Sequence, residues 1–184
     1  MKTRNTMENI SMLKTRNIVL AGLFIALGLI LPFFTGQIPS IGNKLLPMHL
    51  PVLLCGFLLG GPIGLVVGFI LPILRSVLFG MPPLYPAALA MSLELATYGF
   101  VTGFLYRKLP KTTINIFVCL ISAMVAGRIA WGISMLTFLG FSSGKFTLSM
   151  FLGGAFINSL PGLIIQLVII PVILIALRKV KLFN

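Results

Sequence analysis

Residues 51–74, PVLLCGFLLGGPIGLVVGFILPIL, decide the fold of this chain. The stretch has no charged residue, and its two apolar runs are separated only by Gly60, Gly61 and Pro62. Because glycine and proline are the strongest breakers of regular structure, these three residues predict a tight turn between two helices. About 20 helical residues cross a bilayer, so the run before the turn is short for a span. The stretch therefore predicts a helical hairpin inside a membrane.

The composition of the whole chain leads to the same class of protein. Hydrophobic residues make up 58% of the 184 residues and charged residues 9%, whereas an average soluble domain has about 25% charged residues. A soluble fold this apolar would expose large hydrophobic patches, and disordered chains lack such hydrophobicity. The chain is therefore expected to be a polytopic membrane protein.

Six hydrophobic stretches follow a polar and basic N-terminal segment. We expect a basic cytoplasmic segment over residues 1–16 and a single transmembrane domain over residues 17–184. The predicted fold class is an all-α bundle of six transmembrane helices. The expected spans cover residues 17–34, 46–60, 62–79, 84–106, 114–139 and 148–177.

The basic residues outside these spans predict the orientation of the chain. They gather in the N-terminal segment, after the fourth stretch and at the C-terminus, whereas the other side has only Lys44 and Lys145. Because basic residues favour the cytoplasmic side, both termini are expected in the cytoplasm. The formal net charge of +12 does not suggest nucleic acid, because no basic cluster is interleaved with aromatic residues.

Sequence motifs for catalysis and ATP hydrolysis are absent. The sequence has no GxxxxGK[ST] motif for an ATPase and no HExxH motif for a zinc protease. Its single histidine has no serine or cysteine nearby in a recognisable nucleophile setting. Cys55 and Cys119 lie in apolar runs without metal-ligand spacing and are expected to be packing residues. We expect a protein that is not an enzyme and has no cofactor or metal.

Polar residues inside the spans indicate a binding site. Charges in the hydrocarbon are costly and normally face a bundle interior or a wet cavity. The helical rise places the charged residues, the histidine and Asn158 in the half of the membrane away from the cytoplasm. Tyr98 and Trp131 are added because they share helix faces with charged residues. The candidate substrate-binding residues are His49, Arg75, Glu94, Tyr98, Arg128, Trp131 and Asn158.

Two interpretations of the charges stay open. Glu94 can pair with Arg128 or Arg75 and only hold the bundle together. Alternatively, two arginines against one glutamate leave a surplus positive charge that an anionic ligand balances. A structural hydrogen bond and a ligand contact are both possible for His49, as are core and pocket positions for Tyr98 and Trp131.

Small residues on the first span indicate a second site. Ala21, Gly22 and Ala26 lie on its cytoplasmic half, and Gly22 and Ala26 have the small-xxx-small spacing that lets another membrane helix approach closely. The alternative is that this face packs inside the chain's own bundle.

Several segments resemble the substrate-binding S components of energy-coupling factor (ECF) vitamin transporters, and the likeness extends over nearly the whole chain. They are PMHLP at 47–51, GFLLGGP at 56–62, PILRS at 72–76, FGMPP at 79–83 and MSLELATYG at 91–99. One departure is that the AxxxA motif of the family's first span is GLFIA here, at residues 22–26.

The resemblance implies a division of labour in the bacterial plasma membrane. This multi-pass subunit would capture a vitamin from outside, while a transmembrane coupling subunit and two cytoplasmic ATPases would power its release. Pantothenate is favoured, because its carboxylate suits Arg75 or Arg128 and its hydroxyl and amide groups suit Glu94, Asn158 and His49. Biotin, niacin, lipoate, folate and riboflavin are alternative substrates, and a stand-alone carrier or channel is an alternative function.

Overall fold

The computed structural model describes residues 2–35, 44–140 and 147–179, and this part of the chain is all helical, with no strand. The predicted all-α fold class is confirmed. The α-helices are α1 (Lys2–Ile30), α3 (His49–Leu59), α4 (Gly61–Phe79), α5 (Leu89–Lys108), α6 (Thr113–Met135), α8 (Leu148–Leu152) and α9 (Leu160–Lys179). Short 3-10 or π-helical segments are Leu31–Thr35, Leu84–Ala88, Leu136–Gly140 and Gly153–Ile157.

The described residues include 5 helical regions that are long and apolar enough to cross a membrane. They are Thr15–Phe34, Gly61–Phe79, Leu84–Lys108, Thr113–Gly140 and Leu160–Lys179. Helix α3 has only 11 residues, so it is about 16 Å long and does not reach across a hydrocarbon core of about 30 Å. The expected shortness of the second stretch is confirmed, whereas the count of six spans stays a prediction.

The sixth expected span, residues 148–177, is not one continuous helix. A turn at Asn158 and Ser159 separates the π-helical segment Gly153–Ile157 from α9. Glycine is a poor helix former, and Gly153 and Gly154 weaken the first part. Pro161 lies in the first turn of α9, where a missing backbone N–H costs nothing, so a new helix begins there.

Glycines allow α3, α4 and α5 to pack with their backbones in contact. A Cβ added at Gly56 or at Gly64 would lie 2.5 Å from the carbonyl oxygen of Gly99 in α5. Gly60 has a φ of +95° and joins α3 to α4, as the sequence predicts for the turn of the hairpin. Helix α5 also contacts α6, so it lies at the centre of the bundle.

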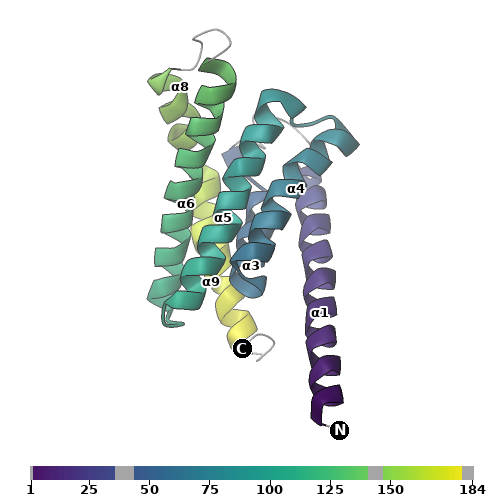
Figure 1. Ribbon diagram of the computed structural model, residues 1–184. Helices are drawn as coiled ribbons and strands as arrows, with labels where there is room; N and C mark the ends of the chain where they lie inside the picture. Colours follow the sequence, from purple (N-terminus) through teal and green to yellow (C-terminus); the bar gives the residue numbers. More distant parts are fainter. Residues whose placement is uncertain (1, 36–43, 141–146, 180–184) are drawn as a thin grey trace.

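Helix α1 begins and α9 ends at the same end of the molecule, at the bottom of Figure 1, where α5 also passes into α6. We call this the basic end, because its described side chains include Arg107, Lys108, Lys111, Arg178 and Lys179. The common position of the first and last helix ends agrees with an even number of crossings. The cytoplasmic location of the basic end stays a prediction.

Candidate functional site

A buried ion pair between α5 and α6 forms the centre of the candidate site. Arg128 Nη1 in α6 lies 2.9 Å from Glu94 Oε1 in α5, and the two side chains are 5% and 2% exposed. The two helices approach closely here because Gly127 has no side chain, so the ring of Tyr98 packs against its backbone. Of the two arginines considered for Glu94 from the sequence, Arg128 is the one that the structure pairs with it.

His49 and Tyr98 complete the polar cluster, a name we use for His49, Glu94, Tyr98 and Arg128. His49 Nε2 lies 3.5 Å from Glu94 Oε1. The rings of His49 and Tyr98 meet edge to face with their centroids 5.2 Å apart, and both side chains are fully buried. Helices α3, α5 and α6 therefore bring together residues that are distant in sequence. Among the described residues, no three His, Cys, Asp or Glu side chains are placed to hold a metal ion.

Several polar atoms of the polar cluster have no hydrogen-bond partner among the residues that the structure describes. They include Nδ1 of His49 and Nε and Nη2 of Arg128. A buried polar atom left unpaired costs about 1–3 kcal/mol. Nε and Nη2 form one edge of the planar guanidinium, and such an edge can donate two parallel hydrogen bonds to a carboxylate. Arg128 thus holds Glu94 through Nη1, and the opposite edge of the guanidinium is unpaired.

Arg75 has a different environment, between α1 and α4. Its Nη1 donates a hydrogen bond of 2.7 Å to the carbonyl oxygen of Leu29. Its guanidinium carbon also lies 5.5 Å and 5.4 Å from the ring centroids of Phe33 and Phe79. Backbone carbonyls near the end of α1 carry partial negative charge, and aromatic faces attract cations. The surplus positive charge expected from the sequence is therefore not gathered beside Glu94.

The last two candidates lie near the end of the bundle opposite the basic end. Trp131 is half-buried and stacks on Phe151 of α8, with ring centroids 6.2 Å apart and an interplanar angle of 24°. Asn158 lies in the turn before α9 and is exposed. The sequence places Asn158 inside a continuous span, and the break in that span is what brings it to the surface.

Gln166 in α9 is a buried polar residue that sequence reasoning missed. It is 0% exposed, and within the described part of the chain neither its amide nitrogen nor its amide oxygen has a hydrogen-bond partner. One turn earlier, Gly162 packs on the backbone of Leu45, just before α3. One turn later, Ile170 belongs to the same apolar cluster as Tyr98. Gln166 therefore lies on the face of α9 that is directed toward the interior of the bundle.

A family comparison decides the class of the protein. The family model for the substrate-specific component of ECF transporters matches residues 16–174, which is most of the chain. The chain belongs to this family. No curated protein and no solved structure matches it significantly.

Membership in the ECF substrate-specific components makes the chain a multi-pass membrane protein of a transport family, not of an enzyme family. It also implies association with the membrane and ATPase subunits of such a transporter and with a small-molecule substrate. The resemblance drawn from sequence segments is thus confirmed at the level of the family.

The candidate docking face of this ECF component lies on α1. Gly22 and Ala26 are exposed, and a Cβ added at Gly22 would meet nothing within 4 Å. Ala21 is half-buried and packs against the apolar cluster that α1 forms with α3 and α4. Gly22 and Ala26 therefore do not serve the packing of the chain's own described helices.

Proposed function

We propose that this chain captures a small anionic vitamin from outside the cell and delivers it to partner subunits for ATP-driven uptake. The observation that supports an anionic substrate is the edge of Arg128 formed by Nε and Nη2. Both nitrogens are buried and have no hydrogen-bond partner among the described residues. Buried donors of this kind are expensive unless a ligand pairs with them. A substrate carboxylate would accept both hydrogen bonds of this edge.

The charges of the polar cluster set a condition on this substrate. Glu94 and Arg128 already balance one another, so a carboxylate beside them adds one net negative charge. The substrate carboxylate would therefore share Arg128 with Glu94. His49, whose Nε2 is 3.5 Å from Glu94 Oε1, can add a ring N–H as a further hydrogen-bond donor.

Pantothenate is the favoured substrate because it combines a carboxylate with an amide and hydroxyl groups. The amide of Gln166 can donate and accept hydrogen bonds at once, and the hydroxyl of Tyr98 can do the same. Both groups are buried, and the amide of Gln166 has no hydrogen-bond partner among the described residues. Arg75, Trp131 and Asn158 stay candidates for further contacts with the substrate. Biotin, niacin, lipoate, folate and riboflavin are the alternatives.

The exposed small residues Gly22 and Ala26 are proposed to receive the transmembrane coupling subunit, with Ala21 at the edge of the contact. Helices in lipid associate largely through close packing, which small side chains permit. The basic end of the bundle is proposed to face the cytoplasm, where the two ATPases act. In this proposed orientation, the docking face of α1 lies nearer to the ATPases than the polar cluster does.

Titration calorimetry on the purified chain tests the proposed substrate class. The panel contains pantothenate, biotin and nicotinate as carboxylates and thiamine as a cation of similar size. We expect one carboxylate to bind and thiamine not to bind, because the buried edge of Arg128 offers hydrogen-bond donors to an anion. Binding of thiamine without binding of any carboxylate would overturn the proposal.

A further inference from the structure

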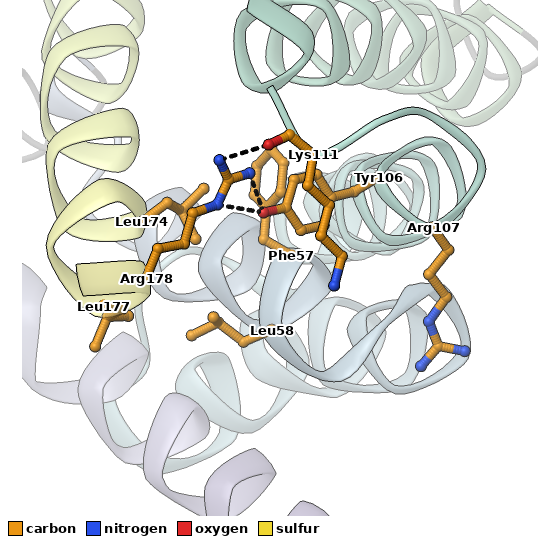
Figure 2. A pocket seen from close by; sticks show the side chains of 8 residues that line it. All are labelled: Phe57, Leu58, Tyr106, Arg107, Lys111, Leu174, Leu177 and Arg178. Atoms are coloured by element: carbon orange, nitrogen blue, oxygen red, sulfur yellow. Dashed lines mark hydrogen bonds between the residues drawn. The ribbon is translucent and has the colours of Figure 1, made fainter. Parts of the chain in front are cut away.

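A second site lies at the basic end, far along the helices from the polar cluster. It is a cavity of about 610 Å³ between α3, α9 and the connection from α5 to α6 (Figure 2). One part of its lining is apolar and consists of Phe57, Leu58, Leu174 and Leu177. The same cavity is also lined by three basic residues, so its walls are amphipathic.

The basic part of the lining is held in place by neutral groups. Arg178 Nε donates to the hydroxyl of Tyr106 at 3.1 Å, and Arg178 Nη1 donates to the carbonyl oxygen of Lys111 at 2.9 Å, as Figure 2 shows. Arg107 Nη2 donates to the carbonyl oxygen of Leu59 at 3.0 Å. These contacts fix two guanidinium groups and add no negative charge.

The three cations of the cavity have no acidic partner among the described side chains. The sequence has only 2 acidic residues. Glu94 is the acid whose side chain the structure describes, and it is paired with Arg128. Arg107, Lys111 and Arg178 therefore form a concentration of positive charge that calls for an external anion.

We propose that this cavity binds an anionic phospholipid, with its headgroup phosphate at Lys111 and Arg178 and an acyl chain along Leu58, Leu174 and Leu177. Arginine, lysine and tyrosine are typical of the level at which lipid headgroups lie. The apolar half of the lining favours a lipid over a free phosphate. A phosphate would leave these apolar side chains uncovered, whereas an acyl chain would cover them. Helix α9, which forms one wall, also exposes Val168 and Val172, as expected for a helix that borders hydrocarbon.

Native mass spectrometry of the purified full chain tests this site. The probes are phosphatidylglycerol and phosphatidylcholine with identical acyl chains, with inorganic phosphate as a competitor. We expect one tightly held phosphatidylglycerol, and Lys111→Gln and Arg178→Gln should each weaken its retention about fivefold. Among the described residues the side chain of Lys111 has no hydrogen bond, so Lys111→Gln tests the charge even if Arg178→Gln disturbs the fold.

Lys108→Gln is the matched control. Its Nζ belongs to the same end of the bundle but lies 4.3 Å from the ring centroid of Phe104 and does not line the cavity. Retention should be unchanged in this variant. Equal retention of the two lipids, equal loss in Lys108→Gln, or displacement of the lipid by inorganic phosphate would each overturn the proposal. Loss of coupling-subunit binding in Lys111→Gln without any lipid preference would also overturn it, since the cavity would then be a protein contact.

Discussion

Arg128 is the residue on which the proposed binding site depends. One nitrogen of its guanidinium faces Glu94 at 2.9 Å, and two others are buried and unpaired. A lysine could not replace it, because an ammonium group has no planar edge for bidentate binding. The proposed role therefore requires the shape of the arginine as well as its charge.

Removal of this guanidinium should weaken substrate binding about ten- to a hundredfold, because charge-assisted hydrogen bonds contribute about 1.5–3 kcal/mol each. Arg128→Met alone would leave Glu94 buried without a partner, at a cost of about 3–5 kcal/mol in stability. The double variant Arg128→Met/Glu94→Gln avoids that penalty. Calorimetry should show a smaller loss in Arg75→Met, whose guanidinium already has partners. Unchanged affinity in the double variant would refute a carboxylate contact at Arg128.

Gln166→Leu should have opposite effects on stability and on binding. Without substrate, both polar atoms of the amide are buried and unpaired, so leucine should stabilise the protein by about 1–3 kcal/mol. With substrate, the lost hydrogen bonds should lower the affinity. Thermal unfolding with and without substrate measures both effects. Asn158→Leu is the control for the stability measured without substrate, because its amide is exposed and its removal relieves no buried group. A fall in substrate-free stability in Gln166→Leu would contradict this account.

At the scale of the elements, glycines decide which helix faces can meet. Gly64 and Gly99 bring the backbones of α4 and α5 together, whereas Gly22 on α1 faces open space. Glycine has the same small size in both places, so its neighbours determine its function. Gly64 is interpreted as a packing residue and Gly22 as a docking residue.

Gly64→Leu and Gly22→Leu form a matched pair that separates packing from docking. A side chain at Gly64 would begin 2.5 Å from the carbonyl oxygen of Gly99, so α4 and α5 must separate, at a cost of about 1–3 kcal/mol or more. Gly22→Leu should unfold and bind substrate like the wild type but lose ATP-dependent uptake. Unfolding curves, calorimetry and transport assays compare the two variants. A loss of substrate binding in Gly22→Leu would show that this face belongs to the chain's own bundle.

The sequence predicts where these helices begin and end better than it predicts which of their faces contact one another. The hairpin at Gly60 follows from local breakers of helix, and the shortness of α3 follows from the length of its apolar run. Hydrophobic periodicity indicates which face of a helix is polar, but the rotation of one helix against another depends on packing. For this reason the sequence suggests a common pocket for Arg75 and Arg128, which the structure gives different partners.

The sequence also contains signs of Gln166 and of the close helix contacts, but their meaning is clear only once the structure is known. Gln166 is an amide within an apolar stretch, the same kind of signal that drew attention to Asn158. The turn at Asn158 reverses their importance, because it exposes Asn158 and leaves Gln166 buried. The spacings Gly56 to Gly60, Gly64 to Gly68 and Gly99 to Gly103 are also small-xxx-small motifs.

At the scale of the whole molecule, the basic end predicts the orientation in the membrane. Cysteines introduced at Lys111 and at Lys44 should differ in their reaction with an impermeant thiol reagent on intact cells. Lys44 should be labelled and Lys111 protected, since basic connections favour the cytoplasm. The native Cys55 and Cys119 are buried, so background labelling should be low. Labelling at Lys111 with protection at Lys44 would invert the orientation.

The central claim is that this ECF substrate-specific component binds a small carboxylate at the polar cluster. Native mass spectrometry of the chain purified from cells that produce it tests this claim most directly. We predict a single small-molecule adduct that is identified as a carboxylic acid and is lost in the Arg128→Met/Glu94→Gln variant. A cationic or neutral adduct, or a carboxylic acid retained equally by that variant, would contradict the claim.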